Sequence, residues 1–180
     1  AQQERSLGLG AMGLHAYYHK HRVPFESAKA SAMNETIFRH IKTQAVEATL
    51  EMGKELGECP DMAGTGKRNA HLLAIAPNAN SSLIGGTSPS IEPWKANAFT
   101  SRTRAGSHLT KNKYLEEELE LLNMNTDEVW SSIITGGGSV QHLDFLSDHI
   151  KGVFKTAIEL DQDMIVMQAG DRQKYLCQGQ

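Results

Sequence analysis

Residues 72–86 read LLAIAPNANSSLIGG, and this stretch sets the expected fold. Its first five residues form a short apolar run between polar flanks, which is typical of a strand buried on both faces. Pro77 ends the run, because proline cannot donate a hydrogen bond to a sheet. The polar turn that follows leads into one or two helical turns around Leu83–Gly86. The buried strand therefore fixes the position of the polar turn that follows it.

This turn has the features of an anion site. Backbone N–H groups at the start of a helix have no partner inside it, and the helix dipole places partial positive charge beside them. Serine hydroxyls add further donors. The turn therefore predicts a phosphate or diphosphate site made of Asn78, Ala79, Asn80, Ser81 and Ser82. The alternative is that Asn80 or Ser81 only caps a short helix.

Composition indicates an ordinary folded domain. The 180 residues carry 18 Lys and Arg against 21 Asp and Glu, a net charge of −3, which disfavours general nucleic-acid binding. The longest apolar stretch, Leu72–Ala76, is far too short to span a bilayer, and no signal segment is visible. The two cysteines, Cys59 and Cys177, cannot form a disulfide framework, and we expect both to be spectators. This usage fits a reduced, cytoplasmic setting without membrane partners.

One long helix is expected over residues 27–56. Its apolar residues recur at steps of three or four, the period of one buried helical face. Ser27 and Gly57 are suited to cap its two ends, and its length would be roughly 45 Å at about 1.5 Å per residue. The residues expected on its buried face are Ile37, Ile41, Ala45, Ala48, Met52 and Leu56.

Four further helices are expected, over residues 6–20, 113–122, 126–134 and 147–169, the last with Gly170 at its end. The last helix would bury Ile150, Val153, Phe154, Ala157, Leu160, Met164 and Met167. Strands are few. Residues 87–110 are irregular apart from a short strand around 98–102, and Lys174–Cys177 has the pattern of the beginning of a strand.

Three motifs have ordinary structural interpretations. Residues 8–13 (GLGAMG) fit the dinucleotide fingerprint, but no strand precedes them, so close helix packing is favoured. Residues 64–68 resemble part of a phosphate loop, but an arginine stands where a hydroxyl is required, so a plain turn is favoured. His15 and His19 have a zinc-ligand spacing without the adjacent glutamate, and we expect solvated or partly packed histidines.

Several blocks of sequence, in order, resemble the large catalytic subunit of ribonucleotide reductases. The first, RSLGLGAMGL at 5–14, is similar to R-S-[IL]-G-[IL]-G-x-x-G-[LF] of that family. The later blocks are PFES at 24–27, RNA at 68–70, APNANSS at 76–82, SIEP at 90–93 and DRQKYLCQGQ at 171–180. The resemblance covers nearly the whole chain.

The resemblance implies an α/β fold. In that family, helices wrap a ten-stranded barrel made of two antiparallel five-stranded halves. Residues 1–180 would be a single partial domain, a mainly helical late portion of this barrel with few short strands. The family's loop equivalent to residues 78–82 holds the diphosphate of the ribonucleotide substrate, which agrees with the anion site predicted above.

The resemblance also implies chemistry that lies outside this chain. The family's radical-bearing cysteine stands in an N-x-C-x-E pattern, which does not occur here, and the two reducing cysteines are absent as a recognisable set. No catalytic residue and no metal ligand is therefore expected in the chain, which alone should be inactive. The intact enzyme would need a metal-radical cofactor in a small subunit and a dithiol reductant. The implied partners are a ribonucleoside diphosphate, the rest of the large subunit and the small subunit, in an oligomer.

Residues 78–82 are similar to the aerobic class that depends on a small subunit, whereas cobalamin-dependent relatives more often carry P-T-G-T at this loop. A fragment of a cobalamin-dependent reductase is therefore an alternative. A second alternative is a non-enzymatic interaction module that binds a partner through the helices beginning at Ser27 and Ser147. A third is a dinucleotide oxidoreductase using Gly8, Gly10 and Gly13, which requires a strand before Gly8.

Overall fold

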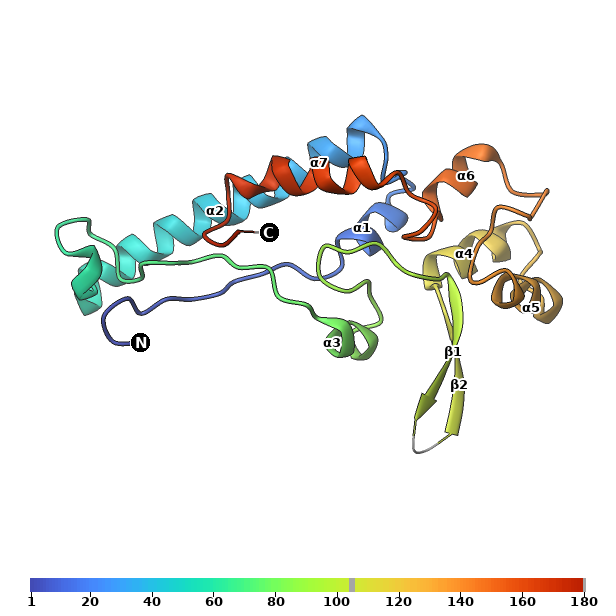
Figure 1. The fold of residues 1–180 in the computed structure, drawn as a ribbon, viewed down its shortest axis with the longest axis horizontal. Coiled ribbons are helices and arrows are strands. Elements are labelled where there is room, and N and C mark those ends of the chain that lie inside the picture. Colours follow the sequence, from blue (N-terminus) through green and yellow to red (C-terminus); the bar gives the residue numbers. More distant parts are fainter. Residues whose placement is uncertain (104–105, 180) are drawn as a thin grey trace.

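The computed structural model describes residues 1–103 and 106–179. Figure 1 shows an elongated molecule in which two long helices run side by side, a group of short helices lies at one end, and a β-hairpin projects from the body. The elements are α1 (Leu14–Lys20), α2 (Ala28–Leu56), the 3₁₀ turn η1 (Pro60–Met62), α3 (Ala79–Ile84), β1 (Ala98–Thr103), β2 (Gly106–Lys111), α4 (Lys113–Leu121), α5 (Asp127–Thr135), α6 (Asp148–Val153) and α7 (Gln162–Gln173). The expected mainly helical chain with few strands is confirmed.

The bounds predicted for α2 are confirmed. The Ser27 side chain accepts a hydrogen bond from the Ala30 N–H at 3.2 Å, and Gly57 ends the helix at a φ of 79°. The predicted buried face is wrong for its last three positions, because Ala48, Met52 and Leu56 are exposed. The residues that α2 buries are Ala30, Asn34, Phe38, Thr49 and Gly53.

Partners at the two ends of α2 explain this different face. At its N-terminal half, the Asn34 side chain donates to the Gln168 carbonyl of α7 at 2.9 Å. At its C-terminal half, the Thr49 hydroxyl donates to the Asn69 side chain at 2.9 Å, and the Arg68 N–H donates to the Thr49 carbonyl. The connection after α2 therefore folds back on a small, polar part of the helix, which apolar periodicity does not reveal.

Residues 6–13 are not helical, which corrects the expected start of the first helix. They run extended beside residues 71–74 and form a parallel bridge between Leu9 and Leu73. A Cβ on Gly10 would lie 2.6 Å from the Ala74 carbonyl oxygen, and Gly13 has a φ of 90° where α1 begins. The glycines thus serve close packing and a left-handed turn. No strand precedes Gly8 in the described chain, so the dinucleotide interpretation fails.

The apolar run at 72–76 is extended but only partly enclosed. Leu72 and Leu73 are buried, whereas Ile75 is half-buried and Ala76 is exposed. On its second side the run receives one hydrogen bond, from the Cys177 N–H to the Leu73 carbonyl at 3.1 Å. The strand expected at 174–177 is therefore reduced to this backbone hydrogen bond and one from the Leu72 N–H to Cys177 Sγ at 3.4 Å among the described residues.

The last long helix is two helices, which corrects the prediction for 147–169. Ser147 caps α6 as expected, by accepting from the Ile150 N–H at 3.3 Å. The chain then turns, and the Glu159 carboxylate accepts from the Thr156 N–H and hydroxyl at 2.7 and 2.8 Å. Asp161 caps α7, and Gly170 lies inside α7 rather than at its end.

The irregular region predicted for 87–110 contains a hairpin. The strand around 98–102 is confirmed as β1, and it pairs antiparallel with β2 from Ala98↔Lys111 to Thr103↔Gly106. Thr126 caps α5 by accepting from the Val129 N–H, as the sequence predicts for that helix. The hairpin brings Thr110–Lys113 beside Trp94–Phe99, and this pairing shapes the site described next.

Candidate functional site

The helix after Pro77 begins four residues earlier than predicted. In α3 the N-cap is Asn78, whose side chain makes no capping hydrogen bond, and the Ser82 N–H donates to the Asn78 carbonyl at 2.8 Å. Neither Asn80 nor Ser81 is the cap, so the capping alternative is wrong. Among the described residues, no group accepts from the backbone N–H of Ala79, Asn80 or Ser81.

Ser82 differs from its neighbours because its donors are already used. It is 3% exposed, and its hydroxyl donates to the Ala79 carbonyl at 2.8 Å. Its own carbonyl accepts from the Thr87 N–H at 3.0 Å, which fixes the chain after α3. Ala79, Asn80 and Ser81 are exposed. The first turn of α3 therefore offers free donors on a turn that Ser82 holds in place.

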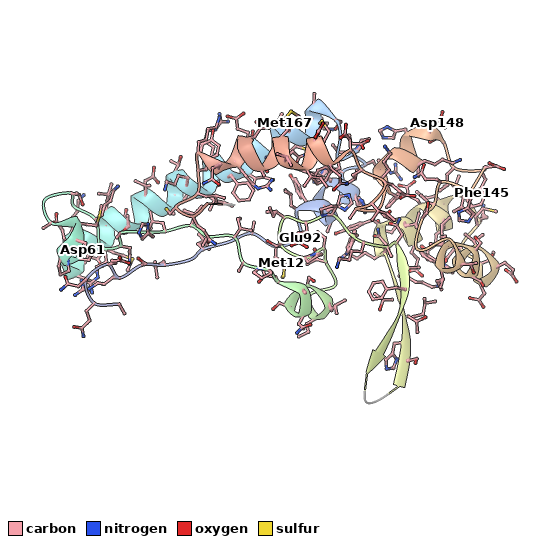
Figure 2. The ribbon with its side chains drawn as sticks, viewed as in Figure 1. Met12, Asp61, Glu92, Phe145, Asp148 and Met167 are labelled. Carbon is pink, nitrogen blue, oxygen red and sulfur yellow. The ribbon has the colours of Figure 1, made fainter. Side chains whose placement is uncertain are left out.

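A cavity of about 520 Å³ lies against α3. Asn78, Ala79 and Ser82 line it from the helix, whereas Asn80 and Ser81 do not. Residues 92–97 and residues 110–113 at the base of the hairpin also line it. Figure 2 shows the labelled Glu92, one of these lining residues, next to α3. The predicted loop and the hairpin base thus share one cavity.

The lining of this cavity has an excess of positive charge. The lining residues include Lys95, Lys111 and Lys113 and one acidic residue, Glu92. The Lys111 ammonium lies 3.5 Å from the Glu116 carboxylate and 4.8 Å from the centre of the Trp130 ring. The sequence pointed only to backbone donors and hydroxyls, because the hairpin that places Lys111 in the lining of the same cavity as Ala79 was not predicted.

Behind the wall of the cavity, α1 buries two histidines. His15 and His19 are 0% and 2% exposed, which corrects the expectation of solvated or partly packed rings. Their Nε2 atoms are 3.0 Å apart, and the Trp94 backbone N–H donates to His15 Nδ1 at 2.9 Å. Burial lowers the pKa of His15 to about 3 and holds the pKa of His19 well below its usual value. Both rings are therefore neutral at pH 7.

Two buried asparagines, Asn112 and Asn97, lie next to the histidine pair. Asn112 Nδ2 lies 3.0 Å from His19 Nδ1 and donates to Asn97 Oδ1 at 2.8 Å. The Asn112 side chain also caps α4 by accepting from the Tyr114 N–H at 3.2 Å. Asn97 Nδ2 donates to the carbonyls of Gly138 and Phe154. Each of these buried polar groups is thus satisfied by another, as buried polar groups require.

The remaining motifs do not form a second site. Residues 64–68 make the expected turn. The Glu58 carboxylate accepts hydrogen bonds from the N–H groups of Gly64 and Gly66, at 2.5 Å each. Cys59 is buried and Cys177 is half-buried. In the part of the chain that the structure describes, no group of three or more His, Cys, Asp or Glu could hold a metal ion. No described helix is both long and apolar enough to cross a membrane.

Comparison with known proteins decides the family. The family profile described as "Ribonucleotide reductase, barrel domain" matches residues 1–66 and 61–180. The chain belongs to the ribonucleotide reductase family. A relative from Frog virus 3 (isolate Goorha) is 56% identical over 180 residues, which is all of this chain and 32% of that protein. The ribonucleoside-diphosphate reductase large subunit of Invertebrate iridescent virus 3 is 46% identical over 184 residues, 100% of this chain and 29% of its own length.

A solved structure supports the same assignment. The alpha subunit of the class Id ribonucleotide reductase from Actinobacillus ureae matches with a TM-score of 0.91 and 40% sequence identity. The match covers 99% of this chain and 33% of that subunit. This fold agreement confirms that the chain is part of a reductase barrel, and the class Id neighbour agrees with the predicted class I type. A stand-alone interaction module is not supported, and the chain spans about a third of the relatives it matches.

Proposed function

We propose that this chain is the part of a ribonucleoside-diphosphate reductase large subunit that holds the diphosphate of the substrate, at residues 78–82. The observation that carries the proposal is the first turn of α3, where the N–H groups of Ala79, Asn80 and Ser81 have no acceptor among the described residues. Oriented donors at a helix start bind anions without reorganisation.

Within the loop, the residues divide into donors and supports. The backbone N–H groups of Ala79, Asn80 and Ser81 would donate to phosphate oxygens, with the Ser81 hydroxyl as a further donor. Asn78 and Ser82 would hold the turn, since the Asn78 carbonyl and the Ser82 hydroxyl already hydrogen-bond within α3. The lysines across the cavity would add an attractive field for a diphosphate.

The chemistry of the reaction would come from other parts of the enzyme. We assign no catalytic residue and no metal ligand to this chain. Radical reduction of the ribonucleotide would need a thiyl radical and a dithiol from the rest of the large subunit, and a metal-radical cofactor from a small subunit. The proposal therefore includes an oligomeric, cytoplasmic enzyme. It requires an N-x-C-x-E segment upstream in the coding sequence and a tyrosine pair downstream.

Ser81→Asp in the complete large subunit tests the loop. The carboxylate favours the start of a helix, so α3 should stay folded, but it repels a diphosphate at the same place. We expect the dissociation constant for a ribonucleoside diphosphate, measured by calorimetry, to rise at least about tenfold. Ser131→Asp, which makes the same charge change on an exposed residue of α5, should leave it unchanged. Equal affinity of the two variants would refute the assignment.

A further inference from the structure

We propose that His15 and His19 are positioning residues for the substrate cavity. Through the hydrogen bond that His15 accepts from Trp94, the two buried rings hold the wall that faces the 78–82 loop. This inference rests on the proposed function, because it takes the cavity beside α3 as the place where the substrate binds.

The contact begins at Trp94, which lines the cavity. Its backbone N–H points away from the cavity and donates to His15 Nδ1 at 2.9 Å. A buried N–H that loses its acceptor is costly, so this bond fixes the main chain at Trp94. The Trp94 ring also packs near both histidines, with ring centres 6.0 Å from His15 and 5.0 Å from His19.

The second ring, His19, contacts His15 through the Nε2 atoms of the two rings, away from the Nδ1 atom of His15 that bonds Trp94. Because His15 Nδ1 accepts, the proton of the neutral ring is on Nε2, and it donates to His19 Nε2 at 3.0 Å. His19 therefore carries its own proton on Nδ1, which donates to the Val153 backbone, and the Asn112 Nδ2 amide, itself a donor, only packs beside it at 3.0 Å. Asn112 lines the cavity and caps α4. The pair of rings therefore sets the position of residue 94, and His19 packs beside residue 112 without a hydrogen bond to it.

The N-terminal end of α1 also holds the chain that leads into the same wall. The Gly13 and Leu14 N–H groups donate to the Ser90 carbonyl at 3.0 and 3.2 Å. The Ala16 N–H donates to the Ser88 hydroxyl at 3.0 Å. α1 thus holds residues 88–94 at two places, first by its N-terminal donors and then by His15.

The surroundings of the rings make this arrangement specific. Phe25 packs edge-on against His15 at 5.5 Å between ring centres, and Phe154 packs edge-on against His19 at 4.7 Å. In such an apolar setting a lost hydrogen bond is not replaced by water, so the bonds from Trp94 to His15 and from His15 to His19 strongly favour one geometry. No other buried pair of titratable rings in the described residues adjoins the cavity.

Two isosteric substitutions separate positioning from general stability. In His15→Asn the amide oxygen can take the place of Nδ1 and accept from the Trp94 N–H. In His15→Gln the amide reaches the place of Nε2 instead and leaves that N–H without an acceptor. His15→Phe keeps the ring volume but removes both nitrogens. His40→Phe, on the exposed side of α2, is the matched control.

The measurement is the KM and kcat of the complete large subunit assembled with its small subunit, with a ribonucleoside diphosphate as substrate. We expect His15→Gln and His15→Phe to raise KM about tenfold with kcat retained, and His15→Asn and His40→Phe to keep KM within about twofold. A variant that is only unstable would lose kcat in proportion to folded protein and keep its KM. Such behaviour in both His15→Gln and His15→Phe would overturn the inference.

Failure of this inference differs from failure of the proposed function. If Ser81→Asp weakens diphosphate binding while His15→Gln keeps the KM of the unchanged enzyme, the loop assignment stands and the positioning role is wrong. If Ser81→Asp has no effect on binding, the loop assignment itself is wrong. His19→Phe provides an independent check, since it should raise KM as His15→Phe does.

Discussion

Burial of two histidine rings in α1 makes the stability of the chain depend on pH. Burial lowers the pKa of His15 to about 3 and also lowers that of His19, whereas an unfolded histidine has a pKa near 6.5. As the pH falls below about 6.5, the unfolded state therefore takes up protons that the folded state excludes. The stability contributed by the neutral rings is present above that pH and is lost on acidification.

We predict a free energy of unfolding that decreases between pH 6.5 and pH 4.5 by up to about 1.4 kcal/mol per pH unit for each ring. Urea unfolding at a series of pH values, followed by circular dichroism, measures this slope. His15→Phe should reduce the slope, and His40→Phe, which removes an exposed ring, should not. Equal slopes in the unchanged chain and in His15→Phe would show that His15 becomes protonated without unfolding.

These residues also mark a limit of sequence analysis. The spacing of His15 and His19 shows that they share a helix face, but their partners Trp94 and Asn112 are 79 and 93 positions away, respectively. No local pattern connects them. By contrast, the free N–H groups of Ala79, Asn80 and Ser81 could be predicted, because a polar turn that starts a helix has free N–H groups wherever it occurs.

Among the elements, the starts of helices with a side-chain cap were predicted better than buried faces, whereas the starts of α1 and α3 were predicted wrongly. Ser27, Thr126 and Ser147 each cap a helix through their own side chain, so the signal and the structure are local. The break between α6 and α7 depends on the Glu159 carboxylate, which accepts hydrogen bonds from Thr156. These bonds compete with a continuous helix, and the pattern of apolar residues does not reveal them. β2 was missed because its residues 106–109 are exposed and mostly polar.

The end of α2 provides a test at the same scale. A Cβ on Gly53 would lie 1.9 Å from the Gly66 carbonyl oxygen, so Gly53→Ala must push the 57–69 connection away. We expect a loss of about 1–3 kcal/mol in unfolding free energy, despite the better helix propensity of alanine. Gly170→Ala in α7 is the matched control, because nothing lies within 4 Å of its Cβ position.

In Gly170→Ala we expect a gain of up to about 1 kcal/mol, since alanine is favoured over glycine inside a helix. Thermal or urea unfolding measures both variants. Opposite signs for the same substitution would show that packing against Gly66, and not helix propensity, governs residue 53. A stabilised Gly53→Ala would contradict the close approach of the connection to α2.

The molecule as a whole has the surface of a part of something larger. Ile84, Ile158 and Val166 are 91%, 87% and 70% exposed. The extended segments at 7–9 and 71–74 bond only to each other and to Cys177 among the described residues. Exposed apolar side chains and open strand edges favour association. Family membership was predictable from ordered motifs, but the extent of this uncovered surface required the fold.

We therefore predict that the isolated 180-residue chain self-associates. Light scattering after size-exclusion chromatography should give a mass well above 19.8 kDa, increasing with concentration. Ile84→Lys and Ile158→Lys together should shift the chain towards monomer without changing its circular dichroism. A chain that is monomeric at all concentrations would contradict this prediction and favour a self-sufficient domain.

The central proposal is that the start of α3 holds the substrate diphosphate. Its most direct test is a crystal structure of the complete large subunit with a ribonucleoside diphosphate bound. We predict phosphate oxygens within hydrogen-bonding distance of the backbone N–H groups of Ala79, Asn80 and Ser81. A diphosphate held only by the lysines across the cavity, or bound elsewhere while the first turn of α3 contacts no phosphate, would contradict it.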